Sequence, residues 1–328
     1  MALQRRVPDD GAVPPRHQLL AVGVAVTWGL NFLAIDASLA HFPPFFLVAL
    51  RFAVMAIPTI LLVPRPDVPL RWLVGYGLGF GTLQFLFLYW GMAAGMPAGL
   101  ASLVLQASAP FTLVLGAALL GERVGPRGVL GVVVAGAGLA VVGWHRAETA
   151  GLLPFLLVLA GALGWAGGNL CSRQARPPKP LHLTLWMSVV PPVPMALLAL
   201  AVEGPDRIAG SLATLGSTQG VLALAGLAYT VLVGTVVGSG VWTWLMARHP
   251  ASQVAPYSML VPVVGMSGAW LVLGERVAPT ELAGAVLVVG GVLLATLRRG
   301  ATGANGAPVP VPPPPRAVAP EPAGAQAH

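Results

Sequence analysis

Long apolar runs with few polar interruptions dominate the hydropathy pattern of the chain. Residues 72–121 form a 50-residue stretch without Asp, Glu, Lys, Arg or His, and residues 208–247 form a second charge-free stretch. A helix that crosses a bilayer needs about 20 apolar residues, so the first stretch accommodates two membrane helices and an uncharged turn. Because Leu, Val, Ala and Gly run continuously instead of alternating with polar residues, the pattern favours helices over a membrane β-barrel.

Charged or Pro/Gly-rich breaks divide the apolar sequence into ten segments of membrane-spanning length. The break at residues 91–99 carries no charge, but Pro97 and three glycines indicate a turn there. The predicted spans cover about residues 18–37, 44–63, 72–91, 98–120, 127–144, 150–171, 181–202, 219–243, 251–273 and 279–297. The predicted fold class is therefore an all-α polytopic membrane protein with ten transmembrane helices.

The composition excludes two other classes of protein. Only 29 of the 328 residues are charged, or 9 %, whereas an ordinary soluble domain carries about 25 %. A soluble domain of this size could not build its polar shell from so few charges. The single cysteine, Cys171, also excludes a disulfide-stabilised secreted scaffold.

The positions of the basic residues predict the orientation of the chain. With the N-terminus in the cytoplasm, 14 of the 18 Lys and Arg residues fall on the cytoplasmic side and three fall outside. The last one, Arg51, lies within the second predicted span. This asymmetry follows the positive-inside rule, so the net charge of +7 reflects topology and predicts no nucleic-acid partner. We expect an inner cell membrane protein with both termini in the cytoplasm.

Two halves of the chain repeat each other. Residues 97–144 align with residues 250–297 at an offset of 153, and Leu-Gly-Glu-Arg-Val occurs at both 120–124 and 273–277. Because each repeat holds an odd number of spans, the second is inserted upside down, a plan that recurs in transporters.

The repeat also predicts how the chain is divided. The expected parts are a cytoplasmic segment (1–17), a first five-helix repeat (18–144) and an inverted second repeat (150–297). Residues 298–328 form a Pro- and Ala-rich cytoplasmic tail. Its composition cannot bury a core, so we expect it to be disordered and dispensable.

Two charges within spans are the first candidates for function. Arg51 lies about seven residues into the second span, where a guanidinium is costly unless it faces a cavity or a partner. It could bind the carboxylate of a small metabolite, pair with Asp36, or extend to the outer surface. Asp36, near the outer end of the first span, is the candidate for proton coupling, with an ion pair or simple exposure as the alternative.

Polar and aromatic side chains within spans are further candidates. Amides inside membrane helices either line a polar cavity or form hydrogen bonds between helices. The aromatic residues beside them either close the cavity or pack in the core. The candidate substrate contacts beyond Arg51 are Asn31, Gln84, Gln106, Asn169, Trp165 and Tyr257.

Two prolines interrupt equivalent spans of the repeats. Proline cannot donate a hydrogen bond to the carbonyl four residues back, so Pro110 and Pro262 release the carbonyls of Gln106 and Ser258. Such carbonyls are tolerated in a membrane where they face a cavity. A simple packing kink is the alternative.

Other motifs predict structure and not chemistry. Glu122 and Glu275 stand at span ends beside arginines and are expected to be end caps or ion pairs. The alternating glycines of residues 75–81 predict close helix packing, because no βαβ unit surrounds them as a dinucleotide site requires. We find no nucleophile–base pair, phosphate loop or metal-ligand spacing, so we expect no enzyme, no bound metal and no cofactor.

These features resemble the EamA family of the drug/metabolite transporter superfamily over about residues 20–297. The resemblance rests on Trp-Gly-Leu-Asn-Phe at 28–32, Arg51-Phe52 and the two Leu-Gly-Glu-Arg copies. Residues 75–78, 95–107 and 254–265 resemble its bacterial O-acetylserine/cysteine exporter branch. In the family pattern a basic residue is common where Asp36 stands, and the Pro-rich tail has no counterpart.

The resemblance implies a secondary transporter that exports small amino-acid-related metabolites of the cysteine/O-acetylserine type by alternating access. Arg51 would meet the substrate carboxylate in such a carrier. The alternatives are a carrier for another small metabolite or drug, and a membrane sensor or enzyme without transport. The expected partners are a small-molecule substrate and the lipid bilayer, and the sequence leaves open whether the chain forms a homodimer.

Overall fold

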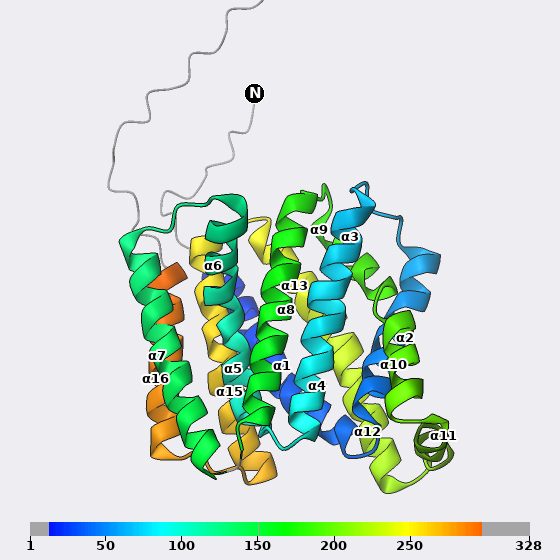
Figure 1. Cartoon of the computed structure of the whole chain (residues 1–328). Coiled ribbons are helices and arrows are strands. Elements are labelled where there is room, and N and C mark those ends of the chain that lie inside the picture. Colours follow the sequence, from blue (N-terminus) through cyan, green and yellow to red (C-terminus); the bar gives the residue numbers. More distant parts are fainter. Residues whose placement is uncertain (1–12, 150, 297–328) are drawn as a thin grey trace, which may run out of the picture. The chain divides into compact units, whose positions relative to one another are not determined.

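The computed structural model describes residues 13–149 and 151–296, which fold into helices (Figure 1). Within these residues, ten helical stretches are long and apolar enough to cross a membrane. The predicted fold class and the number of spans are therefore confirmed. The predicted tail and most of the predicted N-terminal segment lie outside the described residues.

The first five spans include two that change helix type on the way. The third span contains the π-helical segment η1, and the fourth contains the 3₁₀ segment η2. The elements are α1 (Pro15–Leu39), α2 (Pro44–Leu62), α3 (Leu70–Tyr76), η1 (Gly77–Leu83), α4 (Gln84–Ala93), α5 (Ala98–Val104), η2 (Leu105–Ala107), α6 (Ser108–Leu120) and α7 (Pro126–Thr149).

The second five spans repeat these two changes and add two more, η3 in the seventh span and η6 at the end of the ninth. A π-helical segment, η4, interrupts the eighth span, and a 3₁₀ segment, η5, interrupts the ninth. The elements are α8 (Leu153–Ala175), α9 (Pro180–Trp186), η3 (Met187–Val189), α10 (Pro192–Val202), α11 (Pro205–Ala213), α12 (Thr218–Ala228), η4 (Tyr229–Val237), α13 (Gly238–Met246), α14 (Ala251–Val254), η5 (Ala255–Met259), α15 (Leu260–Gly268), η6 (Ala269–Leu273) and α16 (Pro279–Thr296).

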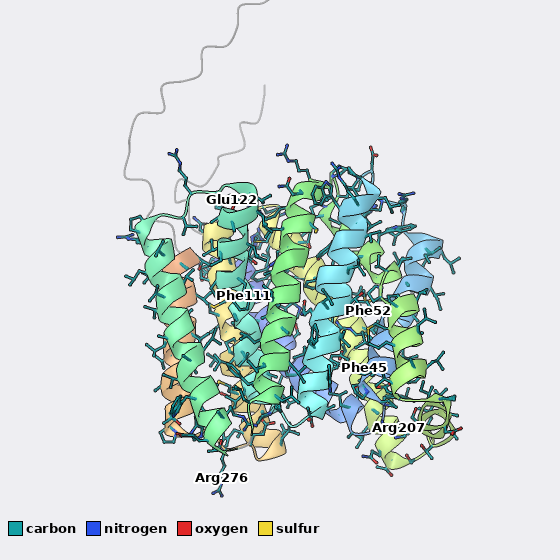
Figure 2. The ribbon with its side chains drawn as sticks, in the orientation of Figure 1. Phe45, Phe52, Phe111, Glu122, Arg207 and Arg276 are labelled. Atoms are coloured by element: carbon teal, nitrogen blue, oxygen red, sulfur yellow. The ribbon has the colours of Figure 1, made fainter. Side chains whose placement is uncertain are left out.

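The two halves run in opposite directions. Helix α1 and helix α8 begin at opposite ends of the bundle, because five spans precede α8 (Figure 1). We call these ends the Glu122 end and the Arg276 end, after two residues that Figure 2 labels there. The inversion expected from the odd number of spans is therefore present.

The repeated Leu-Gly-Glu-Arg-Val motif ends a membrane helix in both halves. Gly121 and Gly274 adopt the left-handed conformation, with φ of 66° and 70°. The following N–H groups reach back into the helix: Glu122 N donates to Gly116 O and Glu275 N to Ala269 O, each at 3.2 Å. This is the glycine-ended helix terminus, in which the N–H after the glycine satisfies an otherwise free carbonyl.

Close packing between the third span and α8 depends on glycine. A Cβ atom on Gly168 of α8 would lie 2.6 Å from the backbone N of Phe80, and one on Gly79 would lie 2.5 Å from the backbone N of Gly168. The packing role predicted for the alternating glycines is confirmed.

Adjacent glycines of α8 provide a matched test of this contact. We expect Gly168→Ala to lower the thermal unfolding midpoint, at a cost of about 1–3 kcal/mol, because backbone must move to admit the methyl group. Gly167→Ala should be neutral or slightly stabilising, because no atom of the described residues lies within 4 Å of the added Cβ. Equal midpoints for the two variants in detergent would contradict this account.

Candidate functional site

Arg51 is buried in the middle of the bundle and bridges three spans. Its side chain is 4 % exposed. Nη1 donates to the hydroxyl of Tyr89 on α4 at 3.0 Å, and Nη2 donates to Oγ1 of Thr235 on η4 at 3.1 Å. Its Nε is buried and has no hydrogen-bond partner among the residues that the structure describes. The Nε donor of the guanidinium therefore stays unsatisfied.

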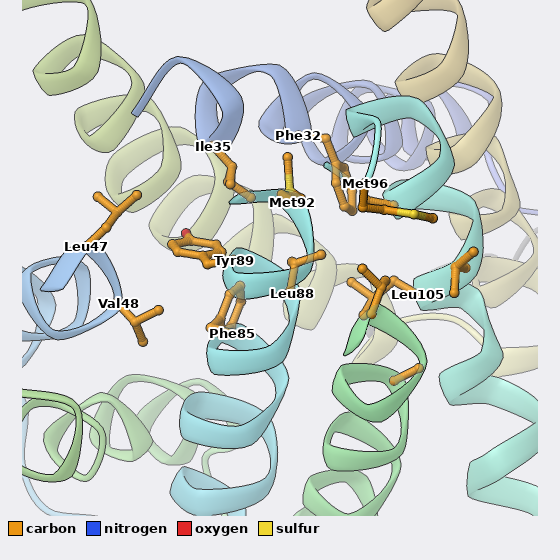
Figure 3. Packing of buried hydrophobic residues seen from close by; sticks show 14 of the residues in the cluster. Phe32, Ile35, Leu47, Val48, Phe85, Leu88, Tyr89, Met92, Met96 and Leu105 are labelled. Atoms are coloured by element: carbon orange, nitrogen blue, oxygen red, sulfur yellow. The ribbon is translucent and has the colours of Figure 1, made fainter. Parts of the chain in front are cut away.

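Aromatic rings enclose the charge of Arg51. Its guanidinium carbon lies 3.9 Å from the ring centroid of Phe85 and 5.2 Å from that of Phe52. Figure 3 shows Phe85 and Tyr89 on α4 among packed apolar side chains, with Leu47 and Val48 of α2 nearby. Ring faces attract a cation, but they leave its net charge in place.

No ion pair joins Arg51 to Asp36 in the part of the chain that the structure describes. The Asp36–Arg51 pair, one of the alternatives from the sequence, is therefore wrong. Asp36 lies on α1, where its side chain is partly exposed.

The π-helical segment η4 carries further polar groups beside Arg51. Oγ1 of Thr235 donates to the carbonyl of Thr230 at 2.9 Å, and the buried Oγ1 of Thr230 has no partner within residues 13–149 and 151–296. A π-helical turn interrupts the regular backbone hydrogen bonding of an α-helix and is frequent at functional sites.

Asn31 on α1 faces the same segment. Its Oδ1 would lie 3.0 Å from a Cβ atom on Gly234, and this buried oxygen has no hydrogen-bond partner in the described part of the chain. Nearby, Nε1 of Trp28 donates to the carbonyl of Gly234 at 2.8 Å. The Trp-Gly-Leu-Asn motif thus packs against η4, close to the residue that holds Arg51.

The predicted amides of the third and fourth spans are buried. Gln84 begins α4 and is 3 % exposed, and its Oε1 has no partner among the residues described by the structure. Gln106 on η2 donates through Nε2 to the carbonyl of Ser258 at 3.4 Å. Because Pro262 cannot donate to that carbonyl, the amide of one repeat binds the interrupted helix of the other. Pro110 and Pro262 are both buried.

In the part of the chain that the structure describes, no hydrogen bond, ion pair or ring contact joins the other predicted residues to Arg51 directly, although the rings of Phe80 and Phe85 link Trp165 to it. Asn169 donates to Oγ1 of Thr112 at 3.2 Å, which makes it a contact between α8 and α6. Trp165 packs edge-on against Phe80 at a centroid distance of 5.7 Å. Tyr257 packs on a separate cluster around Leu245. Among the described residues no ring contact joins Trp165 to Tyr257, and their role beside a substrate stays a prediction.

Sequence reasoning missed the groups that hold Arg51 and one buried glutamate. Tyr89 and Thr235 carry no motif of their own. Glu203, just after α10, is 6 % exposed and accepts hydrogen bonds from the N–H groups of Phe45 at 2.6 Å and Phe46 at 2.9 Å. The sequence offered one signal for this cap of α2: an acidic residue that directly precedes Gly204 at the start of a new helix.

Comparison with known proteins identifies the family. The sequence profile of the EamA-like transporter family matches residues 16–144 and 152–297. The chain belongs to this family. Its two matched segments correspond to the two groups of five spans. Because it belongs to this family, the protein is a membrane transporter and not an enzyme.

Several curated relatives resemble the EamA chain over most of its length. It is 42 % identical over 285 residues to a probable amino-acid metabolite efflux pump of Salmonella typhimurium and 40 % identical over 286 residues to one of Escherichia coli; each match covers 84 % of this chain and 93 % of the relative. A probable terminal-alkyne amino-acid exporter of Streptantibioticus cattleyicolor is 29 % identical, over 83 % of this chain and 91 % of its own.

A solved crystal structure shares the fold. Its TM-score is 0.57 at 22 % sequence identity, and the match covers 87 % of this chain and 97 % of the other. At this identity the likeness concerns the arrangement of helices alone.

Proposed function

We propose that this EamA transporter exports small amino-acid-type metabolites and that Arg51 binds the substrate carboxylate. The observation that carries the proposal is the state of Arg51: a buried guanidinium inside a span, with neutral partners and a free Nε. A buried cation in a membrane costs a few kcal/mol or more unless a partner offsets it. A substrate carboxylate supplies that partner.

The chemistry around Arg51 suits an amino acid. A guanidinium binds a carboxylate through two parallel hydrogen bonds, which adds geometric selectivity. Asn31 Oδ1 and Gln84 Oε1 are buried acceptors that have no partner among the described residues, and an ammonium group offers the donors that they lack there. The efflux-pump names of the relatives at 40–42 % identity support the same substrate class. Cysteine and O-acetylserine are the specific substrates that we propose.

The inverted halves support alternating access as the mechanism. Each half can adopt either of two shapes, and exchange of the shapes moves the opening from one side to the other. In the proposed orientation the Glu122 end faces the cytoplasm, the chain spans the inner membrane and both termini are cytoplasmic. Asp36 remains the coupling candidate.

Counterflow in proteoliposomes tests this function. Purified protein with internal cysteine should accumulate external labelled cysteine, and O-acetylserine should compete. The methyl ester of cysteine should compete at least about tenfold less well, because it lacks the charged group that Arg51 binds. Equal competition by the ester would contradict the role of Arg51, and no uptake of any amino acid in the panel would contradict the function.

The same liposomes separate coupling from substrate recognition. With an imposed pH gradient, coupling through Asp36 requires that Asp36→Asn abolish the response to the gradient while counterflow persists. An unchanged response in Asp36→Asn would exclude this residue as the coupling site.

A further inference from the structure

The two copies of the Leu-Gly-Glu-Arg motif have the same backbone and different side-chain partners. Both motifs end their helices in the same way, as shown by the paired 3.2 Å hydrogen bonds of Glu122 N and Glu275 N. The two carboxylates nevertheless bind different groups. In an inverted repeat, such a difference between equivalent residues distinguishes one end of the bundle from the other.

At the Arg276 end, Glu275 fastens the two repeats together. Its Oε1 accepts from Ala98 N at 2.7 Å and its Oε2 accepts from Gly99 N at 3.0 Å. These are the first N–H groups of α5, where a carboxylate is favoured by both the free donors and the helix dipole. A Cβ on Gly99 would lie 3.0 Å from the Cα of Met266, so α5 and α15 are in close contact beside the bond.

At the Glu122 end, the equivalent glutamate binds a side chain. Glu122 Oε1 is paired with Arg173 of α8, and the two side chains are 37 % and 49 % exposed. Figure 2 shows Glu122 at the end of the bundle opposite Arg276. The pair is accessible to solvent, so it can exchange partners at little cost.

The repeat specifies the other partner that Glu122 can take. The offset that superposes Glu122 on Glu275 also superposes Pro97-Ala98 on Pro250-Ala251. The equivalent of the Glu275 contact is therefore a contact of Glu122 with the first N–H groups after Pro250, where α14 begins.

We propose that Glu275 and Glu122 are two alternating latches of the transport cycle. The Glu275 latch closes the Arg276 end in this structure, while Arg173 holds Glu122 in its open position. In the opposite state Glu122 leaves Arg173 and caps the start of α14, and Glu275 releases Ala98 and Gly99. The inference rests on the proposed alternating access, but it concerns the two ends and not the substrate.

A single reporter cysteine measures the opening of the Arg276 end. Ser102 lies one turn deeper than the latch on α5, is 1 % exposed and faces Gly265 of α15. In a Cys171→Ser background, Ser102→Cys should react slowly with a polar maleimide in detergent. Adding Glu275→Gln should raise this rate about tenfold, because a hydrogen bond from backbone to a charged acceptor is lost.

The decisive variant is at the far end. Arg173→Gln frees Glu122 to close its own end, so it should also raise labelling of Ser102→Cys several-fold, although it touches nothing near the reporter. Glu122→Gln should leave labelling at or below the parent rate. This pattern cannot come from local loosening, and it does not depend on whether Glu275→Gln folds well.

Two controls match these variants. Arg127→Gln removes an exposed cation at the Glu122 end, and Glu281→Gln weakens a cap within one helix, where Oε2 accepts from Ala278 N at 3.0 Å. Neither should change the labelling rate. The proposed latches are wrong if Arg173→Gln gives the same labelling rate as Arg127→Gln. They are also wrong if Glu122→Gln and Glu275→Gln change the labelling rate in the same direction. The labelling assay needs no substrate. A failed flux assay would therefore contradict the proposed function without affecting the test of the latches.

Discussion

Replacing Arg51 with glutamine is expected to lower apparent substrate affinity about thirtyfold or more, since truncating one partner of a buried charged hydrogen bond costs about 2–5 kcal/mol. The variant removes the buried cation while leaving Tyr89 and Thr235 able to bind the amide. Arg51→Lys keeps the charge but loses the two-pronged geometry and the flat contact with Phe85, so its affinity should fall between those of the parent and the glutamine variant. Counterflow and ligand-induced shifts of the thermal midpoint measure the effect.

Arg146 offers a matched control for Arg51. It is also a buried arginine inside a helix, 8 % exposed, and its Nη2 donates to the carbonyl of Gly95 at 3.2 Å. Arg146→Gln should lower stability without a comparable loss of affinity, because this arginine holds a loop at the Arg276 end. Equal losses of affinity in both variants would show that Arg51 acts through stability and does not bind substrate.

Hydropathy predicted the spans well because each one must be apolar over its whole length. The fourth span agrees at residues 98–120, whereas the fifth continues to Thr149, beyond the predicted end at 144. The prediction stopped before Arg146 because charge normally ends a span. The helix continues because a loop carbonyl accepts from that arginine, a contact 51 residues away in sequence.

The candidate site was predictable only where a residue was unusual in itself. Arg51 stood out as a cation within a span, and Pro262 as a break. The partners of Arg51 did not, because Tyr89 and Thr235 lie 38 and 184 residues away and are ordinary polar residues of membrane helices. The partner of Glu275 lies 177 residues away at α5. Local pattern cannot identify contacts between inverted halves.

Removing the Glu203 carboxylate is expected to destabilise the start of α2 strongly. Glu203→Ala leaves the N–H groups of Phe45 and Phe46 without their acceptor, and each buried unsatisfied group costs about 1–3 kcal/mol. A drop of several degrees in the thermal midpoint should follow. The apparent affinity for substrate should fall as well, because Arg51 lies on the same helix. Glu148→Ala, which removes an exposed glutamate, is the control. An unchanged midpoint for Glu203→Ala would mean that water replaces the carboxylate.

Glu203 also makes the stability of the folded protein depend on pH, and its surroundings determine whether that stability rises or falls with pH. It lies just outside the seventh span, and burial raises its pKa above 4.5 even though the N–H groups of Phe45 and Phe46 and the charge of Arg207 act to lower it. The folded protein therefore keeps this proton to a higher pH than the unfolded chain. The resulting stability is fully present below pH 4.5 and is lost as pH rises through the raised pKa. The midpoint of the parent relative to Glu203→Gln should accordingly fall with rising pH over this window. A difference that grows with pH would mean that the two N–H donors outweigh burial and that the carboxylate is the preferred form.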